Sequence, residues 1–276
     1  MRTVIYTILF NNYDWLNDVS HINKFYDTIC YTNNRNLLQR DNYKGWKIRK
    51  INNKDLKGQN IENPILITRW YKFNPSKHLN NYDNSIYIDA NLIIKNNIKY
   101  FIEKCITQNF CLGIFEHPFR SNIRKEICHA FWNKKINYKE FRILKRLYFN
   151  KNANGRLNNL SLFENNLRYT NHNSKNALEI LEKTYEMFKL FPYRDQVILP
   201  IVLDKEKKLN LNLGIFNSSK DYIKVNAHKT KGFKNIRRYI LLKSNNQFFK
   251  YLLFPLNLFL KIFELLYDFK RYNRMK

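Results

Sequence analysis

One short stretch of the chain places a carboxylate and an amide directly after an apolar run. Ser85–Ile88 is followed by Asp89 and, two positions later, by Asn91. Two oxygen-bearing side chains in this spacing can turn toward one hard cation, and Mg²⁺ or Mn²⁺ takes such ligands together with substrate phosphates. The stretch therefore predicts a divalent metal site, with helix capping by Asp89 as the alternative interpretation.

Two cationic side chains upstream of this stretch could pair with phosphates. Arg69 and Lys72 are three positions apart in a segment with helical character, so both lie on one helical face. From that face they could reach the phosphates of a bound ligand. The alternative is that they form part of a solvated surface.

A further group of residues that could carry chemistry opens a predicted helix. Arg194-Asp195-Gln196 precedes the apolar positions Val197 and Ile201. A carboxylate in the first turn of a helix is stabilised by the helix dipole, so capping is one interpretation. The other makes Asp195 a general base that deprotonates an acceptor hydroxyl, or a group that orients this acceptor.

The segment His117–Arg120 (HPFR) follows another apolar run, Cys111–Phe115. It is expected to line the acceptor side of the site, with a turn fixed by Pro118 as the alternative. Glu116 and Glu126 are weaker candidates, because each could simply pair with a nearby arginine.

Segments typical of strands and helices alternate along the chain, which predicts an α/β sheet with helices on both faces. In open sheets of this kind, ligands collect outside the carboxyl ends of the strands. The expected strands are 1–10, 85–89, 92–94 (strand or turn), 111–115 and two short ones within 160–169, and the expected helices are 66–79, 98–105, 177–188 and one from 194, with a loop or short helix over 48–64.

The composition is that of a folded protein with a large positive charge. The 276 residues are 44% hydrophobic and 16% aromatic, which excludes an intrinsically disordered chain. Residues 1–230 are expected to form one domain and 231–276 an appendage. The first ten residues have no signal-peptide cleavage pattern. The four cysteines are interpreted as buried reduced thiols, which are typical of a cytoplasmic protein. They are Cys30, Cys105, Cys111 and Cys128.

The net charge of +27 requires an anionic partner or tolerance of self-repulsion. Residues 120–151 contain ten Lys and Arg against two Glu, with the spacing of helices that have solvated faces. Residues 227–276 contain twelve Lys and Arg against two acids, around a broad apolar stripe. This second pattern predicts a basic amphipathic helix at the surface of an anionic membrane, or else a helix that docks on its own domain. No nucleic-acid-binding motif is present.

Several motifs occur together in a characteristic order. The most specific are Tyr82–Asn91 (YDNSIYIDAN), His117–Arg120 and Arg194–Gln196. The series, which extends over about residues 3–205, resembles the glycosyltransferase-like domain family of plant turgor-regulation-defect and mucilage-related proteins. That family also has bacterial members in surface-polysaccharide gene clusters. The resemblance implies a GT-A-like, Rossmann-like mixed sheet that binds a nucleotide sugar.

The resemblance also implies roles for individual residues. Asp89 and Asn91 would hold Mn²⁺ or Mg²⁺ together with a late histidine, His228, and the acceptor side would contain His117 and Arg120. Asp195 and Gln196 would be catalytic. The residues expected to bind the nucleotide-sugar donor are Thr7, Tyr13, Asp14, Thr32, Arg69 and Lys72.

The function that follows is a metal-dependent glycosyltransferase. It would move a sugar from a nucleotide donor to a lipid-linked or surface-polysaccharide acceptor, at the inner face of the membrane and without a nucleic-acid partner. One alternative is a metal-dependent hydrolase of a lipid amide or ester that uses Asp89, His117 and Asp195. Another is a non-catalytic module that binds polyanions, whose binding would depend strongly on salt.

Overall fold

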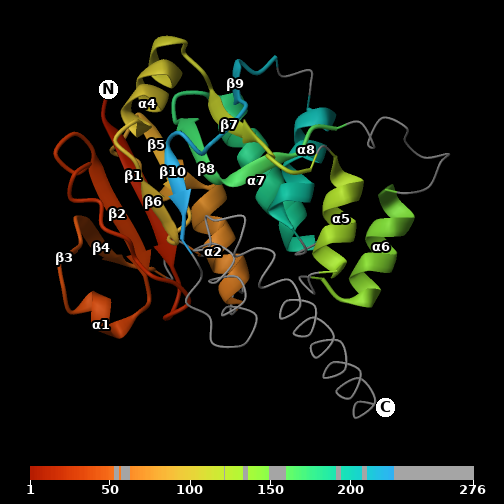
Figure 1. Cartoon of the computed structure of the whole chain (residues 1–276), viewed down its shortest axis with the longest axis horizontal. Helices are drawn as coiled ribbons and strands as arrows, with labels where there is room; N and C mark the ends of the chain where they lie inside the picture. Colours follow the sequence, from red (N-terminus) through yellow and green to blue (C-terminus); the bar gives the residue numbers. More distant parts are fainter. Residues whose placement is uncertain are drawn as a thin grey trace, which may run out of the picture. The chain divides into compact units, whose positions relative to one another are not determined.

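The structure is a computed structural model (Figure 1). It describes residues 1–52, 56, 63–120, 122–132, 136–148, 160–190, 194–206 and 210–226. The chain divides into two compact units, 1–12 with 16–225 and 13–15 with 226–276. All the helices and strands given below belong to the first unit. The predicted boundary at residue 230 and the predicted basic tail, 231–276, lie outside the described residues.

The centre of the first unit is an eight-stranded mixed sheet with the order β3-β4-β2-β1-β5-β8-β7-β9. A separate antiparallel pair is formed by β6 and β10. The strands are β1 (Thr3–Leu9), β2 (Asp27–Thr32), β3 (Asn42–Tyr43), β4 (Trp46–Lys50), β5 (Asn84–Ile88), β6 (Leu92–Ile94), β7 (Leu112–Glu116), β8 (Phe163–Asn171), β9 (Leu213–Phe216) and β10 (Ile223–Val225).

Most strands of the large sheet run in one direction. β1 is parallel to β2 and β5, β2 is parallel to β4, and β7 is parallel to β9. β8 is antiparallel to both β5 and β7, so these two neighbours also run the same way. The carboxyl ends of β1, β2, β4, β5, β7 and β9 therefore share one edge of the sheet, here called the carboxyl edge, where β8 begins.

Helices cover both faces of the sheet (Figure 1). One core lies against α2, α3, α7 and α8, and the core on the other face lies against α4 and the β6–β10 pair. A third, smaller cluster joins α5, α6 and α8. The helices are α1 (Arg35–Leu38), α2 (Pro64–Phe73), α3 (Pro75–His78), α4 (Ile98–Thr107), α5 (Ile123–Trp132), α6 (Tyr138–Tyr148), α7 (Lys175–Leu190) and α8 (Asp195–Lys205).

The residues of β1 explain why this strand lies in the middle of the sheet. All seven are buried, and β-branched or aromatic residues predominate. Val4 and Tyr6 contribute to the core on the α2 side, whereas Ile5 and Leu9 contribute to the core on the α4 side. A strand that is apolar on both faces needs a helical layer on each, as observed.

The predicted α/β architecture with helices on both faces is confirmed. The single helix expected over 66–79 is wrong, because α2 ends at Phe73 and Pro75 starts α3; proline disfavours a helical residue before it. The two short strands expected within 160–169 are one continuous strand, β8, and part of the loop expected over 48–64 is the end of β4.

The predicted burial of the cysteines is observed for three of the four. Cys30, Cys105 and Cys111 are buried, Cys128 is half-buried, and all four are free thiols. None of the described helices combines the length and the apolar character that crossing a bilayer requires.

Candidate active site

A cluster of charged side chains lies at the carboxyl edge, between β5, β8 and the helices α2 and α8. The Lys72 Nζ lies 2.7 Å from the Asp195 Oδ2 and 3.9 Å from the Asp89 Oδ1. The Arg69 Nε lies 3.5 Å from the same Asp195 oxygen. Together with Arg168, described below, these residues are called the Lys72 cluster. The structure thus brings together four predicted site residues that are up to 126 positions apart in the sequence.

Asp89 is the member of the Lys72 cluster that faces solvent, with 39% of its side chain exposed. It directly follows β5, and its N–H donates to the carbonyl of Asn166 at the start of β8. The Tyr87 hydroxyl donates to Asp89 Oδ1 at 2.5 Å. Because the strand β6 follows, rather than a helix, Asp89 does not cap a helix. It is instead a carboxylate fixed at the rim of the sheet.

Arg168 is a fully buried cation beneath this carboxylate. Its Nη2 donates to the main-chain carbonyl of Lys72, and its guanidinium lies 4.8 Å from the Phe73 ring and 6.0 Å from the Tyr87 ring. Within the described part of the chain, its Nε and Nη1 have no hydrogen-bond partner. The Lys72 cluster contains three cations and two carboxylates, and this excess of positive charge favours an anionic ligand.

The charge state of Asp195 follows from its surroundings. Burial by itself would raise the pKa of this carboxyl, but the adjacent Arg69 and Lys72 cations outweigh burial and hold its pKa well below the usual range. Burial lowers the pKa of Lys72, an effect that Asp195 and Asp89 oppose. A carboxylate of such low basicity is a poor proton acceptor at neutral pH. This low basicity argues against the predicted general-base role of Asp195, and the structure pairs the carboxylate with Lys72 and Arg69.

A second polar cluster is centred on Glu126 of α5. It is called the Glu126 cluster and consists of His117, Arg120, Glu126, Arg194 and Gln196. Glu126 is completely buried and forms ion pairs with Arg120 and, at 2.9 Å, with Arg194 Nη2. The Arg120 Nη2 lies 2.6 Å from the His117 Nε2. Burial and the Arg120 charge lower the pKa of His117 to about 4, so its imidazole is neutral at pH 7.

The first turn of α8 joins the two clusters. Arg194 Nη2 donates to Gln196 Oε1 at 2.6 Å on the side of Glu126, whereas the intervening Asp195 points to Lys72. Successive residues of a helix differ by about 100° in direction, so three adjacent residues can serve two different clusters. The motif Arg194–Gln196 is thus a junction between the two clusters, and Arg194, the N-cap residue of α8, forms no side-chain capping hydrogen bond within the part of the chain that the structure describes.

The other residues expected to bind the donor have different surroundings. Thr7 is fully buried in the middle of β1, opposite Cys30. Thr32 ends β2, and its hydroxyl donates to the Leu9 carbonyl at 2.6 Å. Neither threonine contacts the Lys72 cluster in the described structure. Tyr13 and Asp14 lie in the second compact unit, and His228 lies outside the described residues.

The residues around Asp89 fit a divalent cation that takes most of its ligands from a bound substrate. Asn91 is buried in the turn between β5 and β6, and Asn166 has a buried Oδ1 with no hydrogen-bond partner among the described residues. Within these residues, no three His, Cys, Asp or Glu side chains are grouped to hold a metal. One partly exposed carboxylate and nearby amide oxygens are nevertheless a sufficient protein contribution for Mg²⁺ or Mn²⁺ bound through phosphates.

Sequence reasoning missed Arg168 and Asn166. Both lie in β8, in a segment (FENNLRYTN) whose polar residues suggested interrupted short strands. The available signal was an arginine in a run otherwise suited to a strand, since a buried charge in a sheet requires a partner or a function.

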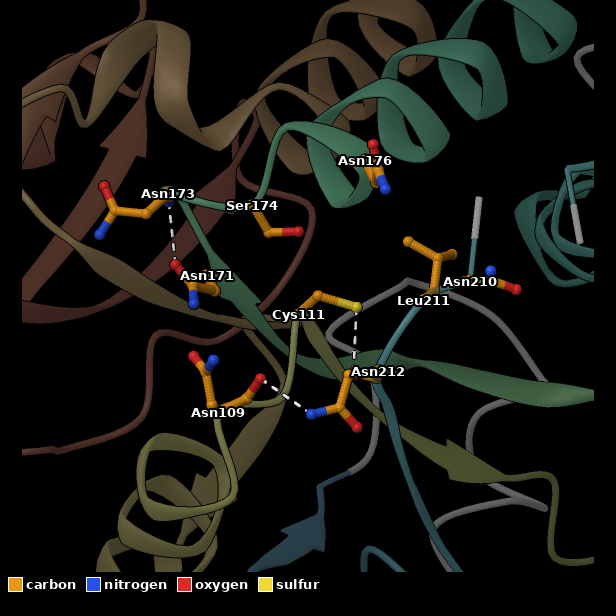
Figure 2. Close-up of a pocket in the computed structure, with 9 residues that line it drawn as sticks. All are labelled: Asn109, Cys111, Asn171, Asn173, Ser174, Asn176, Asn210, Leu211 and Asn212. Atoms are coloured by element: carbon orange, nitrogen blue, oxygen red, sulfur yellow. Dashed lines mark hydrogen bonds between the residues drawn. The ribbon is translucent and has the colours of Figure 1, made fainter. Parts of the chain in front are cut away.

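Two hollows lie at opposite edges of the sheet. One of about 570 Å³ lies at the carboxyl ends of β1 and β2 and is lined by Asn11, Asn12, Asn33, Asn34, Arg35 and Asn36. The other, of about 400 Å³, lies at the opposite edge, where β7 and β9 begin and β8 ends (Figure 2). Its lining is uncharged and consists of Asn109, Cys111, Asn171, Asn173, Ser174, Asn176, Asn210, Leu211 and Asn212.

No protein-family model matches the chain, and no curated protein matches it. Solved structures similar to it include a galactosyltransferase, LgtC, in complex with donor and acceptor sugar analogs (13% identity, 77% of this chain, 72% of that chain, TM-score 0.42). Glucosyl-3-phosphoglycerate synthase from Mycobacterium tuberculosis, in complex with Mn²⁺, uridine diphosphate and glucosyl-3-phosphoglycerate, is 11% identical over 86% of this chain and 75% of that chain (TM-score 0.45). The bifunctional glycosyltransferase WbbM is 9% identical over 79% of this chain and 38% of that chain (TM-score 0.44). Similarity at this level leaves the function to be argued from the residues themselves.

Proposed function

We propose that the chain is a glycosyltransferase that uses a nucleotide-sugar donor. The observation that carries this proposal is the Lys72 cluster, in which a partly exposed carboxylate at the end of β5 lies beside three cations, two of them buried, and the cations outnumber the two carboxylates. The diphosphate of the donor would lie at the carboxyl edge, where open α/β sheets bind their ligands.

The expected chemistry matches the charges of this edge. Transfer of a sugar from a nucleotide sugar releases a nucleoside diphosphate, so the bond to the leaving oxygen breaks as negative charge develops on that group. Fixed cations close to this oxygen stabilise the transition state more than the ground state. Arg69 is the cluster's half-exposed cation and the best placed to contact phosphate, whereas Lys72 and Arg168 act through their fields from buried positions.

Asp89 and Asn91 are the residues that would hold a divalent cation, and Asn166 is a third candidate because of its unpartnered oxygen. Such an ion, when bound, would neutralise part of the diphosphate charge. Asp195 keeps Lys72 and Arg69 in place, and Lys72 in turn is 3.9 Å from Asp89.

The Glu126 cluster would form the acceptor side. His117 is neutral there, and both of its ring nitrogens lie within hydrogen-bond distance of Arg120 or Phe119, so it would act by holding Arg120 toward an acceptor hydroxyl. The acceptor is proposed to be a lipid-linked or surface-polysaccharide glycan. This choice rests on the resemblance of the motifs and on the basic, apolar composition of residues 231–276, which would hold the enzyme at an anionic membrane.

The test is the variant Asp89→Ala, assayed for turnover of a panel of nucleotide sugars with Mn²⁺. We expect a loss of at least about 100-fold, because the variant removes the carboxylate that would hold the divalent cation against the diphosphate. The matched control is Asp27→Ala, which removes a carboxylate at the other end of the parallel strands, where Asp27 pairs with Lys47 at the surface. The proposal fails if Asp89→Ala turns over donor as fast as the unaltered protein, or if no nucleotide sugar is bound or consumed.

A further inference from the structure

The helix pair α5–α6 exposes large aromatic side chains at one end. Trp132, the last residue of α5, is 78% exposed, and Tyr138, the first residue of α6, is 64% exposed. The Phe131 ring lies 6.0 Å from the Trp132 ring and 6.4 Å from the Tyr138 ring, and it stacks on Phe141 at 4.4 Å. The two exposed rings therefore belong to one aromatic tip, defined by Phe131, Trp132, Tyr138 and Phe141.

The packing of α5 and α6 does not require these exposed rings. Their inner faces contribute Ile127, Ala130 and Leu144 to a cluster that also contains Val197 and Ile201 of α8. The helices are thus fixed by other residues, and the apolar area of Trp132 and Tyr138 remains in water. An exposed group of large rings of this kind is typical of an interaction surface.

Basic side chains surround the aromatic tip. The exposed cations of the two helices are Arg124, Lys125, Lys139, Arg142, Lys145 and Arg146. The acids of the described parts of these helices are Glu126, which is fully buried, and Glu140, whose carboxylate accepts from the Asn137 N–H at 2.7 Å. The outer surface is therefore strongly cationic, as expected for a surface that meets an anionic partner.

We propose that the α5–α6 tip is a lipid-contact surface for an anionic bilayer. Tryptophan and tyrosine rings are stable at the level of the lipid head groups, and lysine and arginine beside them pair with lipid phosphates. The rings are concentrated at the end of the helix pair, while the cations lie along its length. This arrangement suits shallow insertion into a planar interface better than base stacking along an extended strand.

The location connects this surface with the Glu126 cluster. α5 presents Trp132 at its exposed end and Glu126 on its inner face, where Glu126 binds Arg120 and Arg194. The same helix, α5, would therefore contact the bilayer at its tip and the proposed acceptor side through Glu126. This inference does not depend on glycosyl transfer. The α5–α6 tip would contact lipid in addition to any contact made by residues 231–276.

The experiment uses the full chain with vesicles of phosphatidylcholine and phosphatidylglycerol that contain brominated acyl chains. Bromine quenches only tryptophans that enter the bilayer. We expect quenching in the unaltered protein and a clear loss of it in Trp132→Phe, which keeps the apolar ring and hence the binding. Trp132→Ser combined with Tyr138→Ser should weaken partition about tenfold. The matched control is Tyr100→Ser, which removes an equally exposed ring from α4.

Charge reversal provides a second, independent test. Lys145→Glu with Arg146→Glu should lower partition to anionic vesicles at least about tenfold and leave partition to pure phosphatidylcholine unchanged. The proposal is overturned if Trp132→Phe is quenched as strongly as the unaltered protein, or if the double serine variant and the charge-reversal variant bind vesicles normally. It is also overturned if they lose only binding to a transfer RNA probe, or change only the oligomeric state; those results would identify a nucleic acid or a second copy of the chain as the partner.

Discussion

The two edges of the sheet are both polar, but they differ in how their polar groups are used. At the carboxyl edge, Lys72 and Asp195 are withdrawn from water and held 2.7 Å apart, with Asp89 left partly exposed above them. At the opposite edge, a pocket of about 400 Å³ is lined by uncharged, mainly amide side chains such as Asn173 and Asn176 (Figure 2).

This difference teaches that a hollow by itself does not identify a site. Burying Lys72 and Asp195 requires a favourable geometry to offset desolvation, and a structure retains such a pair mainly where its charge has a use. The amides of the opposite edge are largely exposed and require no such explanation. Asparagine is also abundant throughout the sequence, so a pocket lined by asparagine is unremarkable here.

The comparison of the two edges predicts the largest loss of stability for the variant Lys72→Met. The variant leaves Asp195 buried, with Arg69 as its remaining ion-pair partner among the described residues, so we expect a loss of about 3 kcal/mol in the free energy of unfolding, measured with urea. The matched control is Lys77→Met in α3, which breaks a half-exposed pair with Glu182 and should cost no more than about 1 kcal/mol.

A double variant separates charge from packing. Lys72→Met combined with Asp195→Asn removes both charges, so its loss of stability should be smaller than the sum of the two single losses. If Lys72→Met costs no more than Lys77→Met, the two edges of the sheet do not differ in the way described. If the single losses add, the two groups are not coupled.

Much of the carboxyl edge could be predicted from the sequence. The apolar run before Asp89 identified the strand end, and the helical spacing of Arg69 and Lys72 correctly placed both on one face. Their partner could not be deduced, because Lys72 and Asp195 are 123 positions apart and only the antiparallel insertion of β8 and the packing of α8 bring them together. Lys72 was therefore expected at a phosphate, whereas the structure pairs it with a carboxylate.

The Glu126 cluster and β8 show a different limit of sequence reasoning. Glu126 was a weaker site candidate that could simply pair with a nearby arginine, yet it forms ion pairs with two, one from before α5 and one from the start of α8. Local patterns do not specify such three-element contacts, because they depend on how helices cross. Arg168 was missed for a related reason: its burial follows from the central position of β8, which the sequence did not indicate.

A smaller effect is expected from His117, which lies at the carboxyl edge but is only partly buried. Its pKa of about 4 in the folded chain lies below that of an unfolded histidine, about 6.5, so the unfolded chain binds a proton that the folded chain does not. Stability should therefore fall as the pH decreases from about 6.5 to about 4. His117→Asn should lack this part of the pH dependence, which we put at about 1 kcal/mol after allowing for solvent screening.

The measurement is urea unfolding of both proteins at pH 7.5, 5.5 and 4.5. The difference in stability between the unaltered protein and His117→Asn should shrink as the pH falls. His78 and His172 also have lowered pKa values and titrate in both proteins, so they cancel in this difference. A constant difference across the three pH values would mean that His117 titrates normally and does not share the electrostatics of the Glu126 cluster.

The smallest effect should come from placing a charge at the opposite edge. Asn173→Asp introduces a carboxylate of nearly the same size at an exposed position of the amide-lined pocket, where water can solvate it. We expect a change of less than about 0.5 kcal/mol in the free energy of unfolding and no change in donor turnover. The reverse substitution at the carboxyl edge, Asp89→Asn, should leave stability nearly as unaffected but reduce turnover, because it removes the charge that would hold the divalent cation. If Asn173→Asp impaired turnover as much as Asp89→Asn, the opposite edge would also bind a reactant, and the distinction between the two edges would be wrong.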